Sequence, residues 1–151
     1  MGLFGCTTGS TLTTTAPRST VSRDKALTMA KQVAASIGGR VYAIASSGSM
    51  LPTLDEGSIV TVEMVALDKL KKGDIIIYRN TSGVAVIHRL YERHNDRWYV
   101  LGDNNTSVDR EMVSVGNFIG RVCAIFYTAA GSERISDSTS MSLPTAVASA
   151  Q

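Results

Sequence analysis

The sequence contains few of the residues on which several classes of protein depend. Its 151 residues include only two cysteines and two histidines. Cys6 lies in a polar segment and Cys123 in an apolar one, which does not indicate the disulfide framework of a small secreted domain. No cysteine lies near His88 or His94 in the sequence, and the spacing typical of a zinc site is absent. The sequence therefore predicts no metal site and no cofactor.

Charge and long apolar runs are also scarce. The formal net charge is +2, from 15 basic and 13 acidic residues, which gives no indication of nucleic acid as a partner. No stretch approaches the ~18 apolar residues that a membrane span needs, and the first residues lack the apolar region of a signal peptide. We therefore expect a soluble chain, whose membrane association would depend on a partner or a lipid. No compartment is indicated.

The apolar pattern changes from helical to strand-like near residue 40. Apolar residues recur at helical spacing within Arg23–Ile37, at Ala26, Met29, Ala30, Val33 and Ile37. Ser22 is a candidate N-cap, and Gly38 follows the last periodic residue. Beyond residue 40, short runs of β-branched and aromatic residues alternate with turn-forming residues. The six expected strands are Val41–Ala45, Ser58–Met64, Asp74–Arg79, Val84–Glu92, Arg97–Leu101 and Phe118–Thr128.

This pattern predicts one mainly β domain with polar ends. Short strands at such spacing are typical of an antiparallel sandwich or barrel, here with one N-terminal helix. The domain is expected over residues 23–130, with the helix at about 23–37 and the β part at about 40–128. Residues 1–22 and 131–151 are rich in serine, threonine and alanine, so we expect both to be disordered.

One loop concentrates hydroxyl groups between two of the expected strands. Residues 46–54 read Ser-Ser-Gly-Ser-Met-Leu-Pro-Thr-Leu. Taken alone, this composition is typical of an ordinary turn. The chain also has His88 in an apolar strand and an acidic loop, residues 102–110, with Asp103 and Asp109. A serine, a histidine and an aspartate are the components of an activated nucleophile, which favours a catalytic interpretation.

Four segments, in order, resemble the motifs of the signal peptidase I superfamily, which also includes the LexA-like self-cleaving repressors. They are Ser47–Thr53, Lys72–Tyr78, Ile87–Arg89 and Gly102–Asn105 with the Asp109–Arg110 pair that follows it. Together they span about residues 41–127. Most bacterial members carry a lysine at the position of the general base. His88 stands there in this chain, so it resembles the histidine-bearing branch typical of endoplasmic reticulum and archaeal signal peptidases.

The resemblance implies a coiled, mostly antiparallel β fold and a role for each motif residue. Ser49 is expected to be the nucleophile and His88 the general base. Ser47 is expected to contribute a hydroxyl to the oxyanion hole; the alternative is a turn serine bonded to its own backbone. Asp109 is the expected third member of the catalytic group. Asp103 competes for that role, or supports the site by capping its own loop.

By the same resemblance, the chain is expected to be a serine endopeptidase that cleaves a peptide or protein substrate after small residues. The substrate would lie extended along a strand edge, by β-addition. The first alternative is a LexA-like self-processing protein, for which residues 129–131 (Ala-Ala-Gly) and 148–150 (Ala-Ser-Ala) are candidate cleavage sites. The second alternative is a catalytically silent binding module on the same fold.

Overall fold

The computed structural model describes residues 15–129 and 143–147, and these form a helix followed by a β barrel. The elements in chain order are α1 (Arg23–Ile37), β1 (Arg40–Ala45), β2 (Ile59–Glu63), the 3₁₀ turn η1 (Leu67–Lys69), β3 (Ile75–Arg79), β4 (Ala85–His94), β5 (Arg97–Leu101), β6 (Phe118–Phe126) and β7 (Thr145–Val147). The six expected strands are all present, with ends that differ by at most two residues. β7 was not expected.

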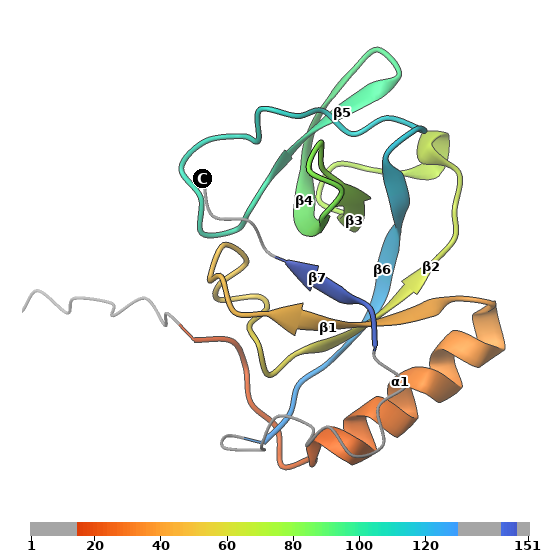
Figure 1. The fold of residues 1–151 in the computed structure, drawn as a ribbon, viewed down its shortest axis with the longest axis vertical. Coiled ribbons are helices and arrows are strands. Elements are labelled where there is room, and N and C mark those ends of the chain that lie inside the picture. Colours follow the sequence, from red (N-terminus) through yellow and green to blue (C-terminus); the bar gives the residue numbers. More distant parts are fainter. Residues whose placement is uncertain (1–14, 130–142, 148–151) are drawn as a thin grey trace, which may run out of the picture.

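Six strands close into a ring (Figure 1). Their order is β3-β6-β2-β1-β7-β4, and pairing between β4 and β3 completes the circle. β5 extends the sheet outward from β4. The pairings among β1 to β6 are antiparallel, whereas β7 runs parallel to both of its neighbours. The expected fold, mainly antiparallel β with one N-terminal helix, is confirmed.

Helix α1 begins and ends where its capping residues predict. The side chain of Ser22 accepts a hydrogen bond from the backbone N–H of Lys25 at 3.4 Å. Gly38 takes a φ of 64°, the left-handed conformation that glycine adopts readily after a helix. The buried side of α1 is a stripe of three alanines, Ala26, Ala30 and Ala34. Met29 and Ile37, expected on the buried face, are exposed, because the short alanines make the contact with β1 and β2.

Two groups of buried side chains form the core on the two faces of β3 and β4. The first fills the barrel and contains Tyr42, Ile44, Met50, Leu54, Val60, Val62, Ile75, Ile77, Ile87 and Ala146. The second lies toward β5 and contains Leu70, Ile76, Tyr78, Val86, Leu90, Trp98, Val100 and Val113. Because β3 is covered on both faces, its sequence is continuously apolar rather than alternating. His88 lies on the face of β4 shared by Val86 and Leu90.

Parts of the two segments expected to be disordered lie among the described residues and contact the barrel. Most of residues 1–22 and 131–151 lies outside the described residues. Within the described part, Ala16 is buried, and the hydroxyl of Ser19 donates to the carbonyl of Tyr127 at 2.6 Å. Ala146 of β7 is also fully buried. Single alanines inside polar segments gave the sequence no apolar period, so these contacts were not predicted.

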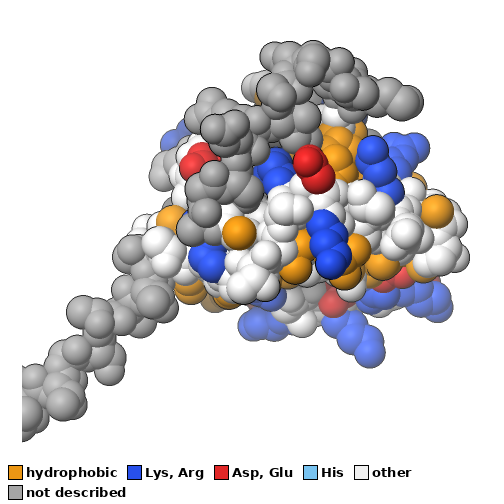
Figure 2. All heavy atoms as spheres, turned by 90° about the horizontal axis from the view of Figure 1, so that it is seen from below, with side chains coloured by type: hydrophobic (Ala, Val, Ile, Leu, Met, Phe, Trp, Pro, Cys, Tyr) orange, Lys and Arg blue, Asp and Glu red, His pale blue; other side chains and the backbone are white. Residues whose placement is uncertain are grey.

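Charged side chains are spread over the uncovered part of the face seen in Figure 2. Figure 2 shows Lys and Arg side chains scattered there among uncharged and hydrophobic ones. This distribution agrees with the small net charge of the whole chain, +2. In the part of the chain that the structure describes, no helix combines the length and the apolarity needed to cross a membrane.

Candidate active site

Ser49 and His88 lie in direct contact, where the loop that follows β1 meets β4. The Oγ atom of Ser49 is 2.9 Å from Nε2 of His88. Ser49 stands four residues beyond the end of β1, and His88 lies within β4. Their exposed fractions are 2% and 0%. The closed ring therefore brings together two residues that are 39 positions apart in the sequence.

Asp109 contacts the other side of the His88 ring. Its Oδ2 atom lies 2.7 Å from Nδ1 of His88, and its side chain is buried. An ionised carboxylate only accepts hydrogen bonds, so Nδ1 must carry the shared proton. In the neutral ring, Nε2 is then free to accept the hydrogen of the Ser49 hydroxyl. A single tautomer of His88 thus satisfies both contacts.

Two further contacts hold Asp109 in place. Its backbone N–H donates to the carbonyl of Val100 in β5 at 2.9 Å. The hydroxyl of Tyr78, from β3, donates to Oδ2, the oxygen that also accepts from His88. Burial raises the pKa of Tyr78 above its usual value, and the hydrogen bond to Asp109 raises it further. Tyr78 therefore remains a neutral donor at physiological pH.

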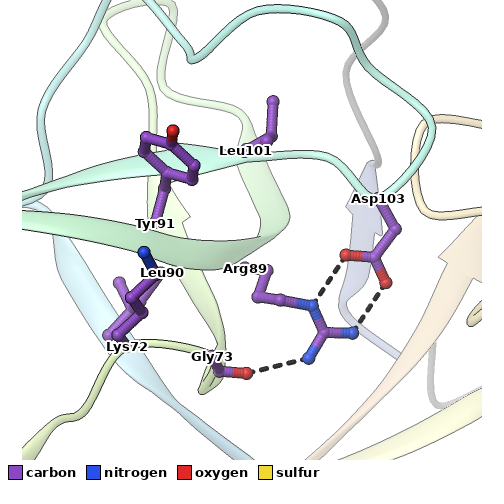
Figure 3. Close-up of a pocket in the computed structure, with 7 residues that line it drawn as sticks. All are labelled: Lys72, Gly73, Arg89, Leu90, Tyr91, Leu101 and Asp103. Carbon is purple, nitrogen blue, oxygen red and sulfur yellow. Dashed lines mark hydrogen bonds and ion pairs between the residues drawn. The ribbon is translucent and has the colours of Figure 1, made fainter.

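Asp103 makes different contacts from Asp109. Figure 3 shows its carboxylate facing the guanidinium of Arg89, with both nitrogen–oxygen distances 2.7 Å. Arg89 also donates to the carbonyl of Gly73 at 2.8 Å, and the hydroxyl of Thr53 donates to Asp103. The hydrogen bond to Asp103 raises the pKa of the Arg89 guanidinium. Asp103 thus fastens the acidic loop to β4 and to the loop that follows Ser49.

The acidic loop packs tightly against the serine loop. The backbone N–H of Asn104 donates to the carbonyl of Ser49 at 2.8 Å, and its amide donates to the carbonyl of Gly48 at 3.1 Å. A Cβ atom at Gly102 would lie 2.7 Å from the Ser49 carbonyl oxygen and 2.9 Å from Nε2 of His88. Real Cβ atoms do not approach other atoms so closely, so this position requires glycine.

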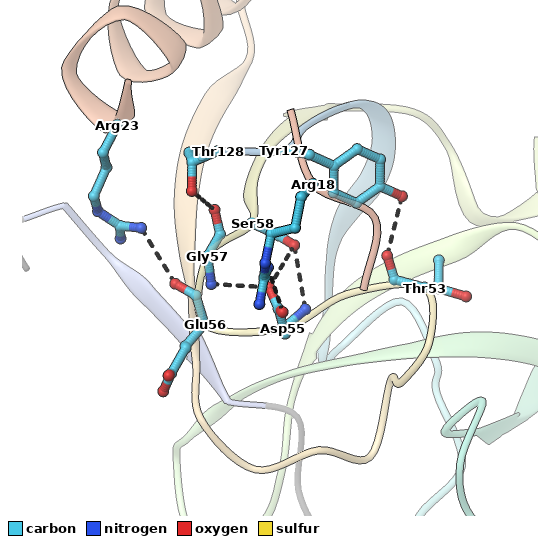
Figure 4. Close-up of polar contacts among 9 residues, drawn as sticks. All are labelled: Arg18, Arg23, Thr53, Asp55, Glu56, Gly57, Ser58, Tyr127 and Thr128. Carbon is cyan, nitrogen blue, oxygen red and sulfur yellow. Dashed lines mark hydrogen bonds and ion pairs between the residues drawn. The ribbon is translucent and has the colours of Figure 1, made fainter. Parts of the chain in front are cut away.

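The loop after Ser49 is held from its other side as well (Figure 4). The hydroxyl of Tyr127 donates to the carbonyl of Thr53 at 3.1 Å. Asp55 pairs with Arg18 of the N-terminal segment at 2.6 Å and accepts the backbone N–H of Gly57 at 2.9 Å. The position of Ser49 is therefore fixed from both sides of its loop.

Three buried polar atoms of the serine loop and the acidic loop have no hydrogen-bond partner among the described residues: Oγ of Ser47, Nδ2 of Asn105 and Oδ1 of Asp109. Nδ2 of Asn105 lies beside Gly102, because a Cβ there would be 2.8 Å from it. Buried polar groups are nearly always paired, so unpaired donors need an explanation. The hydroxyl of Ser47 and the amide of Asn105 thus each keep a hydrogen available for a further acceptor.

The structure thus brings three of the five candidate residues, Ser49, His88 and Asp109, into one chain of contacts. Ser47 lies in the same loop as Ser49, and Asp103 is paired elsewhere. Sequence reasoning assigned no part to Tyr78 or Asn104. Both lie in segments that it singled out. A tyrosine in an apolar strand is typical of the hydrophobic core, and an asparagine in a turn is typical of a turn-forming residue, so neither indicated a role in the site. Among the described residues, no group of three or more His, Cys, Asp or Glu side chains could hold a metal ion.

Comparison with known proteins agrees with this arrangement. The family described as Peptidase S24-like matches residues 8–123, more than half of the chain. The chain belongs to the Peptidase S24-like family. It is also 36% identical over 76 residues to signal peptidase I W of Bacillus subtilis (strain 168), covering 47% of this chain and 40% of that protein. The chain thus spans less than half the length of this relative. The expected membership of the signal peptidase and LexA-like superfamily is confirmed.

Proposed function

We propose that this member of the Peptidase S24-like family is a serine endopeptidase that uses Ser49, His88 and Asp109. One observation carries the proposal: the unbroken contact from Ser49 Oγ to His88 Nε2, 2.9 Å, and from His88 Nδ1 to Asp109 Oδ2, 2.7 Å. A serine hydroxyl is a weak nucleophile until a base within hydrogen-bond reach accepts its proton. The base in turn must be held in the correct tautomer, and Asp109 is in position to do so.

The reaction follows from these contacts. Oγ of Ser49 attacks the carbonyl carbon of the substrate peptide bond while Nε2 of His88 takes its proton, and Asp109 stabilises the imidazolium that forms. The same proton passes to the leaving amine as the C–N bond breaks, which leaves an ester on Ser49. Water, deprotonated by His88, then hydrolyses the ester, releases the acid and restores Ser49.

Ser47 is proposed to stabilise the oxyanion of the tetrahedral intermediate. Its buried and unpaired hydroxyl lies two residues before Ser49. Together with the backbone N–H of Ser49, it would donate to the negative oxygen, which forms only during the reaction. Donors of this kind are typically worth about 3–4 kcal/mol in the transition state.

The proposed substrate is an extended peptide with small residues, such as alanine, before the cut. The name of the relative, signal peptidase I W, supports a peptide substrate, and the preference for small residues is what the family resemblance implies. In the alternative, the chain cleaves itself, as LexA-like repressors do. A silent binding module is the remaining possibility, and one experiment separates all three.

The test compares the wild type, Ser49→Ala and Ser46→Ala by intact mass, with and without a peptide that bears an Ala-X-Ala site. Ser46 is exposed in the same loop and serves as the matched control. We expect cleavage by the wild type and Ser46→Ala, and a loss of about 10⁴-fold or more in Ser49→Ala. If only the chain's own tail is lost, and only when Ser49 is present, the self-processing alternative replaces the proposal. If neither chain nor peptide is cut, the proposal is wrong.

A further inference from the structure

β7 differs from the other strands of the ring. It contains only three residues, Thr145–Val147, and it is parallel to β1 and to β4. The pairings among the remaining strands are antiparallel. Figure 1 shows β7 lying between β1 and β4, which it joins. We call the space between Ala43–Ala45 of β1 and Val86 of β4, which β7 fills, the seam.

Both walls of the seam lead toward the candidate nucleophile and base. Val147 pairs with Ala45 on one side and with Val86 on the other. Ser49 follows Ala45 by four residues, and His88 follows Val86 by two. Because β7 runs parallel to both walls, its own direction is also toward the contact between Ser49 and His88. A substrate peptide bound by strand addition needs this place and this direction.

The seam accepts a small side chain. Ala146 is fully buried in the barrel core, where its group includes Tyr42, Met50 and Ile87. Thr145, on the opposite face, is exposed. Interiors of this kind are close-packed, so a larger side chain in place of Ala146 would force its neighbours apart. The sequence continues after Val147 with three more small residues, alanine, serine and alanine.

Ser49 and His88 are nearly inaccessible in this arrangement, with exposed fractions of 2% and 0%. A nucleophile that cleaves a peptide from another molecule must be reached by it. Some part of the chain therefore has to move before such a peptide binds. β7 is the shortest strand of the ring, and each of its pairings can be replaced by an incoming peptide strand.

We propose that Thr145–Val147 occupies, within the same chain, the site at which a substrate peptide binds, and so competes with it. This inference rests on the proposed function, because it takes Ser49 as the nucleophile. A tethered competitor acts at a high effective concentration and weakens external binding without changing the reacting groups. β7 thus raises the KM of the enzyme for an external peptide and leaves kcat unchanged.

The first test measures binding without catalysis. Full-length Ser49→Ala and Ser49→Ala/Ala146→Asp are titrated with a labelled peptide of the tail sequence, Leu-Pro-Thr-Ala-Val-Ala-Ser-Ala-Gln. A buried carboxylate at position 146 has no partner, so the tail leaves the seam and the peptide enters it. We expect the double variant to bind at least about tenfold more tightly. Thr145→Asp, at the exposed neighbouring position, is the matched control and binds like Ser49→Ala alone.

Ala146→Gly covers the case in which Ala146→Asp does not fold. It removes one methyl group and adds no charge, so we expect a folded chain with intermediate peptide affinity. If either folded variant of Ala146 binds the peptide no more tightly than its parent, β7 is a structural strand and the inference is overturned. A tail peptide that itself carries Ala→Asp at the same position should bind to none of the chains.

The second test uses chains that retain Ser49, and it separates the inference from the proposed function. With an Ala-X-Ala peptide, Ala146→Gly should lower KM and leave kcat unchanged. Cleavage with the same KM in both chains would overturn the inference while the proposed function stands. If the Ala146 variants bind the tail peptide more tightly in the first test but no chain cleaves the Ala-X-Ala peptide in the second, the seam is still a peptide-binding site. The proposed function is then wrong.

Discussion

Gly102 lies so close to His88 that a Cβ atom at position 102 would be 2.9 Å from Nε2 of the imidazole. The same atom would be 2.7 Å from the carbonyl oxygen of Ser49. The absence of a side chain at one position of the acidic loop therefore sets the distance between the candidate nucleophile and its base.

Gly102→Ala should accordingly reduce catalysis more than it reduces stability. The added methyl group has to displace Ser49 or His88, and a shift of about 1 Å at a reacting group lowers the rate about 10²-fold. Steady-state kinetics on the Ala-X-Ala peptide would measure this loss. Gly116→Ala is the control, because its Cβ would meet no atom closer than 3.8 Å. Equal activity of the two variants would contradict the expected crowding at Gly102.

Asp109→Asn and Asp103→Asn should have different effects, although both residues lie in the same loop. An amide at position 109 can donate to Nδ1 and so favours the wrong tautomer of His88, which should lower kcat about 10⁴-fold. Asp103→Asn weakens the pair with Arg89 and should lower the free energy of unfolding by about 1–2 kcal/mol, with kcat within tenfold of the wild type. Kinetics combined with urea unfolding would separate the effects. A larger loss of kcat in Asp103→Asn than in Asp109→Asn would reverse the assignment.

Ser47→Ala should lower kcat about 10²- to 10³-fold and leave KM unchanged, because the hydroxyl would act only on the oxyanion. It should not destabilise the fold, since the buried Oγ has no partner to lose among the described residues. Ser46→Ala again provides the control. Unchanged kcat in Ser47→Ala would show that Ser47 is an ordinary turn serine with no part in the oxyanion hole.

Tyr78 should make the fold less stable at alkaline pH. Its pKa is raised in the folded chain, first by burial and then by Asp109, so the folded state holds the proton more tightly than the unfolded state. The contribution of this proton to the free energy of unfolding is at its full value below the ordinary tyrosine pKa of about 10, and it is lost as the pH rises above that value. The slope is about 1.4 kcal/mol per pH unit for one proton.

Urea unfolding between pH 9 and 11.5 would measure this loss, with the wild type compared to Tyr78→Phe. The free energy of unfolding of the wild type should fall more steeply above pH 10, because the variant has no proton to lose at this position. Tyr91→Phe, at an exposed ring, should follow the wild type. Parallel curves for the wild type and Tyr78→Phe would show that the proton of Tyr78 is not linked to folding.

Much of this fold could be predicted from the sequence, because local signals agreed with the final structure. Ser22 and Gly38 cap α1 as expected, and turn-forming residues separate the six predicted strands. The resemblance of four motifs to a known family also singled out Ser49 and His88, whose side chains lie 2.9 Å apart in the structure. These features depend on residues close together in the sequence, where periodicity and turn chemistry act.

Contacts through space set the limit of the prediction. Asp103 and Asp109 stand in one loop, and their different partners, Arg89 and His88, become distinct only when β4 passes beneath that loop. The hydrogen bond from Tyr78 to Asp109 crosses between two segments that share no sequence pattern. β7 is still harder to predict, because it is a three-residue segment within a Ser/Thr/Ala-rich part of the sequence, too short for a period to mark it as a strand.

The closure of the barrel by β7 also has a consequence for the order in which the parts of the fold form. Ala43 pairs with Thr145, so this pairing of the ring joins two segments that lie far apart in the sequence. Contacts of such large sequence separation form late, and synthesis on the ribosome delivers the C-terminal residues last. Ser49, His88 and Asp109 all precede residue 143, so they are synthesised before the segment that fills the seam. The seam can therefore close only after the strands on both of its sides have been made, when Thr145–Val147 pairs with β1 and β4.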